Sequence, residues 1–229
     1  MKYDIIKSDS RGSQKLDWLD SKFSFSFANY YSPNRMGFGT LRVLNDDIIA
    51  PNSGFGAHPH ANMEIISIVL EGEITHQDSM GNKYTLSCGD VQVMSAGTGI
   101  IHSEFNENLE KEVKMLQIWI ETSKKGFEPR YEQKNYSLEE NKLIKLVDQN
   151  FDDMYIYQNS TISRLILDKN KEFDYQISNN RKLYLFLIEG EIEILDKKLQ
   201  TRDAIQIESL DKLKISSNTI SDILFIETV

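Results

Sequence analysis

The stretch "VLEGEIT", residues 69–75, has a second version later in the chain, "LIEGEIEI", residues 187–194. When the two stretches are aligned, Gly72 falls on Gly190. In both copies an apolar, β-branched run leads into a Glu-Gly-Glu turn and resumes after it, which is typical of two strands joined by a tight turn. Internal similarity of this kind indicates that one structural unit occurs twice.

Each copy is followed by a second related motif. "GDVQVM", residues 89–94, resembles "RDAIQI", residues 202–207. The matched pairs are Asp90 with Asp203 and Gln92 with Gln206. The sequence therefore predicts two related domains, which we place at residues 1–135 and 136–229, with the polar segment around the boundary as the connection.

The rest of the chain favours an all-β fold. Short runs rich in β-branched and aromatic residues, such as "IISIVL", "MLQIWIET" and "ISRLIL", recur between clusters of Gly, Asp, Asn and Ser. Two segments could form helices, residues 13–21 and residues 137–147. The apolar residues of the second segment suit a strand equally well. Neither segment could organise a helical core.

Charge and composition exclude several classes of function. The chain has 26 Lys and Arg against 35 Asp and Glu, a formal charge of -9, and no clustered basic stripe, so we expect no direct nucleic-acid partner. Its single Cys cannot form an intrachain disulfide, and the first residues lack the apolar run of a signal peptide. We expect a cytoplasmic protein without a membrane span.

The four histidines suggest a metal site. His58 and His60 are two residues apart in "GFGAHPH", and His102 and Glu104 have the same spacing in "GIIHSEFN". In a strand, residues i and i+2 point to the same face. Two neighbouring strands of a barrel could therefore direct three imidazoles and one carboxylate to one cation. This donor set suits Fe, Ni, Cu, Mn or Zn better than Ca.

Spacing alone leaves some choices open. Glu64 lies four residues after His60 and would share its face in an unbroken strand, so either Glu64 or Glu104 could supply the carboxylate. His76, in "THQDS", is interpreted as a residue beside the site or at the surface. Trp119 is interpreted as a core residue rather than as a surface that stacks on a substrate.

The second copy has lost the candidate ligands. Without gaps, the positions that correspond to the four candidates are Gln176, Ser178, Ser216 and Asn218, and no histidine follows His102. Any metal site of this type therefore belongs to the first domain alone.

The motifs resemble those of the pirin family, bicupins of the cupin superfamily that include bacterial quercetin 2,3-dioxygenase-like members. The resemblance extends over nearly the whole chain, from "WLDSKFSFSFANYY" and "MGFGTLRVLNDD" through "GFGAHPH", "MEIISIVLEGEITHQDSMGN" and "GDVQVMSAGTGIIHSEFN" to "LQIWI" and "YEQK". It implies two cupin domains, jelly-roll-like β-barrels, of which only the first keeps a metal.

In this family the HPH and HSE motifs are understood to bind the metal. The resemblance thus implies the ligands His58, His60, His102 and Glu104, with Glu64 at most beside them. It implies one divalent ion per chain, with Fe(II) favoured and Mn, Ni, Cu and Zn as alternatives. Glu104 is the implied catalytic residue, since it can accept a proton as it loosens from the metal.

The implied reaction is ring-opening 2,3-dioxygenation of quercetin or a related flavonol, with release of carbon monoxide. The implied partners are a small aromatic substrate and dioxygen. The alternative function is an iron-binding, redox-sensing regulator that acts through a protein partner and has no flavonol substrate. Because two barrels can cover each other's sheet faces, we expect a monomer.

Overall fold

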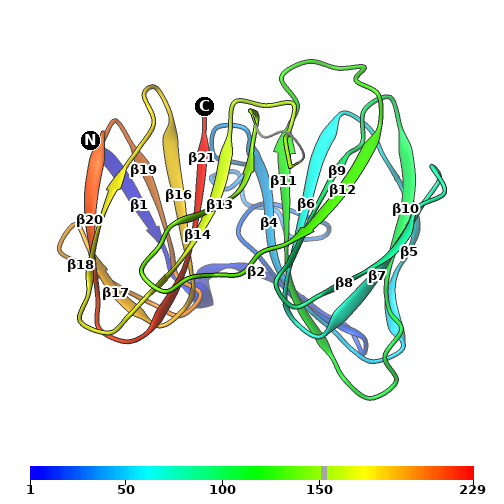
Figure 1. The fold of residues 1–229 in the computed structure, drawn as a ribbon, viewed down its shortest axis with the longest axis horizontal. Helices are drawn as coiled ribbons and strands as arrows, with labels where there is room; N and C mark the ends of the chain where they lie inside the picture. The colour runs from blue at the N-terminus through cyan, green and yellow to red at the C-terminus, as the bar shows by residue number, and fades with distance from the viewer. Residues whose placement is uncertain (151–153) are drawn as a thin grey trace. The chain divides into compact units, whose positions relative to one another are not determined.

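The structure is a computed structural model that describes residues 1–150 and 154–229. The predicted all-β class is confirmed: apart from the short 3-10 turn η1 (Ser8–Ser10), the regular elements of the described residues are strands (Figure 1). In these parts of the chain no helix is long and apolar enough to cross a membrane.

Both helical candidates are wrong. Residues 13–21 contain β2 (Gly12–Lys15) and most of β3 (Leu19–Phe23), and residues 137–147 lead into β13 (Ile144–Asp148). In β3, Leu19, Ser21 and Phe23 are buried while the residues between them are more exposed, which is the period of a strand. The strand alternative for residues 144–147 is the correct one.

The described residues group into two compact units. One comprises residues 12–136, 150 and 154–158, and the other comprises 1–11, 137–149 and 159–229. This grouping differs from the predicted division at residue 135 because the first strand, β1 (Lys2–Ile6), pairs with β19 (Ala204–Glu208) along its whole length. The start of the chain therefore forms an edge strand of a sheet whose other strands are C-terminal.

The first unit has a seven-stranded sheet, in the order β12-β9-β6-β11-β4-β3-β2, and a four-stranded sheet, in the order β5-β10-β7-β8. Its remaining strands are β4 (Leu41–Ile49), β5 (Ser53–His60), β6 (Met63–Glu71), β7 (Glu73–Asp78), β8 (Lys83–Ser87), β9 (Asp90–Ser95), β10 (Ile100–Asn106), β11 (Val113–Glu121) and β12 (Arg130–Asn135).

The second unit repeats this plan with a six-stranded sheet, β1-β19-β16-β21-β14-β13, and a four-stranded sheet, β15-β20-β17-β18. Its remaining strands are β14 (Thr161–Leu167), β15 (Glu172–Gln176), β16 (Lys182–Glu189), β17 (Glu191–Ile194), β18 (Lys197–Gln200), β20 (Lys212–Ser217) and β21 (Ser221–Thr228).

The repeated Glu-Gly-Glu turn has the same role in both units. Gly72 joins β6 to β7 with φ +78°, and Gly190 joins β16 to β17 with φ +108°. A Cβ atom would lie 2.6 Å from the Glu112 carbonyl oxygen at the first position and 2.7 Å from the Ile220 carbonyl oxygen at the second. Both the backbone angle and the close approach therefore require glycine.

The interiors of the two units differ in chemistry. The second is filled by one apolar cluster contributed by both of its sheets. The first has two smaller apolar clusters, one around Ile74 and Met115 and one around Ile65 and Met94. Its buried residues also include many polar side chains on strands β3 to β11: Ser21, Asn45, Asp47, Ser67, His76, Gln92, His102, Glu104 and Gln117. Among the described residues, the buried histidines and Glu104 thus all lie in the first unit.

Candidate metal centre and its cavity

The three histidines of the two predicted motifs meet on strands β5 and β10, which lie side by side (Figure 1). The ladder places His58 directly opposite His102, and His60 opposite Ile100. The ring centroids are 4.5 Å apart for His58 and His102, and 4.9 Å apart for His60 and His102. One nitrogen from each ring lies within 4.8 Å of the nitrogens from the other two.

The surroundings keep two of these rings uncharged near neutral pH. Burial, followed by the nearby His58, lowers the pKa of His60 to about 4. Burial, together with the three neighbouring histidines, lowers the pKa of His102 to about 2. Since a metal binds the neutral imidazole, these rings are already in the state that can coordinate an ion.

The hydrogen bonds also leave nitrogen lone pairs available. The Nδ1 atom of His58 donates to the Gly56 carbonyl oxygen at 2.8 Å, so Nε2 of that ring keeps its lone pair. The Nε2 atom of His102 is buried and has no hydrogen-bond partner. A buried polar atom without a partner costs free energy unless a ligand satisfies it. The three histidines therefore fit a transition-metal ion.

Glu104 is buried on the same strand as His102, and its carboxylate is held by two hydrogen bonds. The Ser67 hydroxyl donates to Oε1 at 3.0 Å, and the Gln117 amide donates to Oε2 at 2.6 Å. Glu104 is not part of the cluster formed by the three histidines. Burial raises the pKa of Glu104, whereas the nearby His76 and the hydrogen bonds lower it. Its role as a fourth ligand stays a prediction.

The alternative carboxylate, Glu64, faces away from the histidines. The strand is not continuous between His60 and Glu64, because β5 ends at His60, β6 begins at Met63, and Asn62 has φ +53°. This turn removes the shared face that unbroken spacing would give. The Oε2 atom of Glu64 instead accepts a hydrogen bond from Ser95 at 2.6 Å, on the face of β6 opposite to Ser67.

Burial raises the pKa of Glu64 to about 7, although Ser95 and Arg130 oppose the shift. The folded protein thus keeps a proton that the unfolded chain releases from pH 4.5 upward, and the free energy of unfolding falls as the pH rises toward 7. We expect Glu64→Gln to remove this decline, so that the variant gains roughly 3 kcal/mol relative to the parent between pH 4.5 and 7.5.

Urea unfolding of the metal-free proteins, followed by tryptophan fluorescence, measures this difference, since Trp18 and Trp119 both belong to the first unit. The exposed Glu121, changed to Gln, is the matched control. If the free energy of unfolding changed with pH in the same way in the parent and in Glu64→Gln, the buried carboxyl would not be the cause of the decline.

A cavity of about 390 Å³ opens beside the histidines within the first unit. Its walls are largely apolar and aromatic, and its polar lining includes His58, His60, Glu104 and Gln117 together with residues of β3 and β4. The lining residues of β3 and β4 are Leu19, Ser21, Phe23, Asn45 and Asp47, and the aromatic residues of the lining are Trp18, Phe23, Phe27, Phe55 and Trp119. Such a cavity is large enough for a small organic ligand.

Trp119 is not simply a core residue, as the sequence had suggested. It lines the cavity, its ring stands edge-on to His60 with centroids 4.9 Å apart, and its indole N–H donates to Gln117 at 3.2 Å. Sequence reasoning also missed Asn45 and Asp47. The available signal was their spacing of two residues within one strand, which places both on the same face.

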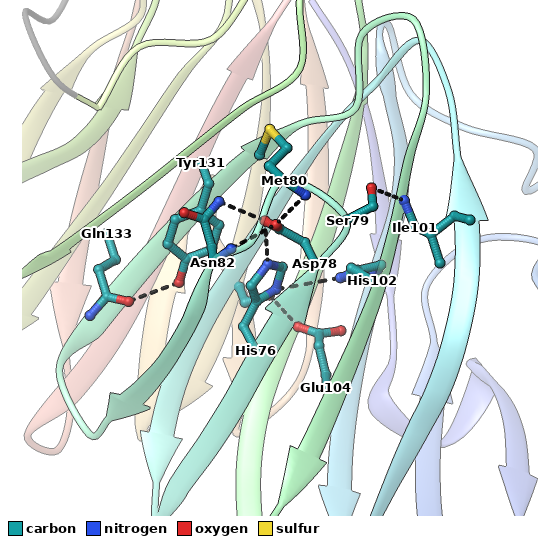
Figure 2. A network of polar contacts seen from close by, with 11 residues as sticks. His76, Asp78, Ser79, Met80, Asn82, Ile101, His102, Glu104, Tyr131 and Gln133 are labelled. Carbon is teal, nitrogen blue, oxygen red and sulfur yellow. Dashed lines mark hydrogen bonds and ion pairs between the residues drawn. The ribbon is translucent and has the colours of Figure 1, made fainter.

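His76 is fully buried, which excludes the surface interpretation and leaves the position beside the site. Its Nδ1 atom is 3.5 Å from Nδ1 of His102, and its Nε2 atom is 3.1 Å from Oδ2 of Asp78 (Figure 2). The ring stacks on Tyr131 with centroids 4.5 Å apart. Asp78 was not anticipated, although it completes an alternating His-x-Asp pattern at the end of β7.

Strand pairing in the second unit gives the true counterparts of the site. His76 and Ile194 each lie four residues after the turn glycine, and they pair with Glu104 and Ile215 respectively. Glu104 thus corresponds to Ile215. Two residues earlier, His102 corresponds to Leu213, and the residues paired with these two are His58 and Tyr175. His60 then corresponds to Ile177.

The ungapped counterparts Gln176, Ser178, Ser216 and Asn218 are therefore wrong by one to three positions. The matched pair of Gln92 and Gln206 is also wrong, because Gln92 pairs with Ser67 while Ile205 pairs with the corresponding Leu185. The loss of the ligands in the second copy holds nonetheless. Its true counterparts, Tyr175, Ile177, Leu213 and Ile215, all belong to the apolar cluster that fills the second barrel.

Comparison with known proteins matches the two parts of the chain to two different family models. Residues 6–120 match the family model of pirin, and residues 147–228 match the model of the quercetinase C-terminal cupin domain. The chain belongs to the pirin family. This membership confirms the predicted arrangement of two cupin domains.

Several members of the pirin family are similar to the chain over almost their full length. Quercetin 2,3-dioxygenase of Escherichia coli K12 is 40% identical over 224 residues, which cover 97% of each chain. The crystal structure of YhhW from Escherichia coli superposes with a TM-score of 0.96 at 37% identity, covering 100% of this chain and 98% of that one.

A second crystal structure, bacterial pirin YhhW from Escherichia coli in complex with nickel(II), superposes with a TM-score of 0.94 at 37% identity and covers 99% of both chains. A pirin with this fold therefore binds a transition-metal ion. Together with the three clustered imidazoles, this supports a metal ion in the first barrel of the present pirin-family chain.

Proposed function

We propose that this protein is a metal-dependent dioxygenase that opens the ring of quercetin or a related flavonol with release of carbon monoxide. The observation that carries the proposal is the convergence of three imidazoles beside a buried carboxyl, at the wall of a largely aromatic cavity. The relatives named quercetin 2,3-dioxygenase support the choice of substrate.

His58, His60 and His102 would hold the ion, and Glu104 would be the fourth ligand. We propose Fe(II) as the native ion, although the donor set accepts several divalent ions. Four protein ligands leave two positions of an octahedral ion open. When bound, the metal would supply Lewis-acid binding of a substrate oxygen and a site for dioxygen.

The cavity would orient a flat aromatic substrate and exclude water from it. Trp18, Phe27, Phe55 and Trp119 contribute aromatic surface, and a cavity of about 390 Å³ is in the range of small-molecule sites. Burial of the substrate among these rings strengthens the polar interactions at its reacting end, because the local dielectric is low.

Glu104 would act as the general base. Burial raises its pKa, so the carboxylate binds a proton more readily than an exposed glutamate. The proton of the reacting flavonol hydroxyl would pass to one of the carboxyl oxygens, which Ser67 and Gln117 hold inside the barrel. This transfer converts the hydroxyl into the more electron-rich oxyanion that dioxygen can oxidise.

Gas and product analysis tests the proposed reaction. Metal-loaded protein and quercetin are mixed with ¹⁸O-labelled dioxygen, and carbon monoxide and the organic product are measured. We expect one carbon monoxide for each quercetin consumed, and both labelled atoms in the ring-opened product. Quercetin loss without carbon monoxide, or a product that contains unlabelled oxygen from water in place of the labelled atoms, would contradict 2,3-dioxygenation.

Asn45 offers a further polar contact at the wall of the cavity. It is 3% exposed, lines the cavity, and its Oδ1 atom is buried without a hydrogen-bond partner. A hydroxyl on the non-reacting ring of the substrate could donate to this oxygen. We expect Asn45→Leu to lower kcat/KM for quercetin about 2–12-fold, the equivalent of one neutral hydrogen bond.

The matched substrate is 3-hydroxyflavone, which keeps the reacting hydroxyl and lacks the others. Its kcat/KM should be nearly the same in Asn45→Leu and in the parent. An equal loss of kcat/KM for both substrates would mean that Asn45 stabilises the barrel and does not bind a hydroxyl of the substrate.

A further inference from the structure

A chain of polar contacts leads from Asp78 through His76 to His102, which is a member of the histidine cluster (Figure 2). Asp78 is at the end of β7, and His102 is directly opposite it on β10. The three side chains are all buried. Neither Asp78 nor His76 is among the residues that line the cavity, and His76 also faces Glu104, its partner in the ladder (Figure 2).

The carboxylate of Asp78 accepts hydrogen bonds on both oxygens. Oδ1 accepts from the backbone N–H groups of Met80 and Asn82, at 2.9 and 3.2 Å. Oδ2 accepts from the side-chain amide of Asn82 at 2.9 Å and lies 3.1 Å from Nε2 of His76. Burial works against ionisation, but the hydrogen bonds from Asn82 and His76 lower the pKa of Asp78. An ionised carboxylate cannot donate, so the proton of this contact is on Nε2 of His76.

The position of the proton on His76 determines which nitrogen of His102 carries a proton. A neutral imidazole with its proton on Nε2 has a lone pair on Nδ1. Nδ1 of His76 faces Nδ1 of His102 at 3.5 Å, so His102 must be the donor of this contact. The lone pair of His102 is then on Nε2, the buried atom that has no hydrogen-bond partner in the protein.

The plane of the His76 ring is also held in place. Tyr131 stacks on one face, with an interplanar angle of 30°, and Tyr84 stacks on Tyr131 with ring centroids 5.4 Å apart. The Tyr131 hydroxyl donates to Gln133 at 2.8 Å, which fixes the tyrosine in turn. The stacking thus restrains the plane of the His76 ring between Asp78 and His102.

We propose that Asp78 and His76 are positioning residues that set the tautomer of His102 and so present its Nε2 lone pair to the metal. This inference rests on the proposed metal centre. Residues that orient a metal-binding histidine in this way typically change the metal affinity 10–100-fold when they are replaced.

The Asp78→Asn variant tests the relay because it reverses the direction of donation. The amide oxygen would stay with the two backbone N–H groups, and the amide NH₂ would face Nε2 of His76. That nitrogen must then accept, so the proton of His76 moves to Nδ1 and the proton of His102 moves to Nε2. Each ring keeps one proton, but His102 no longer offers a lone pair to the metal.

Two measurements follow the change. In metal-free protein, ¹⁵N NMR of the histidine rings should show a pyridine-type Nε2 for His102 in the parent and a pyrrole-type Nε2 in Asp78→Asn. Competition with a chelator should show that the affinity for Ni(II) falls 10–100-fold in Asp78→Asn. The exposed neighbour Gln77, changed to Asn, should leave both values unchanged.

His76→Phe is the second variant, in case Asp78→Asn disturbs the turn at Met80. It keeps a ring against Tyr131 and removes both hydrogen bonds, so we expect a mixture of His102 tautomers and weaker Ni(II) binding. A pyrrole-type Nε2 in the parent, or unchanged spectra and affinity in both variants, would overturn the inference. Absence of Ni(II) binding by the parent would contradict the metal centre instead. The ¹⁵N spectra would still show which tautomer His102 adopts in the parent and in the variants.

Discussion

Glu104→Gln is expected to lower the turnover of quercetin by 10²–10⁴-fold, the usual contribution of a general base, while much of the bound metal is retained. The three histidines remain in this variant, so most of the donor set is intact. The amide has nearly the same shape as the carboxylate but cannot accept the proton of the flavonol hydroxyl. Steady-state kinetics and metal analysis on the same samples measure both effects.

Glu107→Gln is the matched control, since Glu107 is exposed, follows β10, and forms an ion pair with Lys83 at the surface. Tryptophan fluorescence of Glu104→Gln shows whether the first barrel stays folded. Unchanged turnover in a folded, metal-loaded Glu104→Gln protein would remove Glu104 from the mechanism.

His102→Ala should weaken metal binding by more than about 100-fold, beyond the effect of residues that only orient a ligand. His102 is 1% exposed, lies opposite His58 in the ladder, and carries the buried Nε2 atom without a partner. Its removal leaves two imidazoles that are partly open to solvent. Equilibrium dialysis against Ni(II) or Fe(II) measures the affinity directly.

Ile101→Ala is the control for this change, because Ile101 is the preceding residue of β10 and its side chain is 51% exposed. It should bind metal like the parent. If His102→Ala also kept the affinity of the parent, the ion would have to lie elsewhere than at the three histidines.

Much of the fold could be predicted because the decisive signals are local. The Glu-Gly-Glu turns require glycine for backbone reasons, and the alternating patterns of the strands show their inner faces. The pairing of β1 with β19 could not be predicted, since it joins residues about 200 positions apart and leaves no local pattern. For the same reason the predicted boundary did not account for residues 1–11.

The candidate site was predicted where strand period alone decides the geometry. The spacing of His58 with His60, and of His102 with Glu104, placed each pair on one face. Spacing could not choose between Glu64 and Glu104, because it does not show the turn at Asn62, which changes the phase before Glu64. Aligning the second copy without gaps failed likewise, because its loops differ in length by one or a few residues, and each such change moves every side chain to the other face.

Neighbours across strands were the hardest to anticipate. Ser67 and Gln117 are opposite each other on β6 and β11 and together hold Glu104. Their importance depends on the register of three strands, which a single sequence does not show. The burial of His76 has the same origin, since it follows from the pairing of β7 with β10.

We propose that the histidine cluster of the first barrel supports metal-dependent oxidation of a flavonol. The most direct test loads metal-free protein separately with Fe(II), Mn, Ni, Cu and Zn and follows quercetin loss in air, with His102→Ala as the control. We expect quercetin loss that requires both a metal and His102. Stoichiometric metal binding without quercetin loss for any of the ions would contradict it and favour the redox-sensing role through a protein partner.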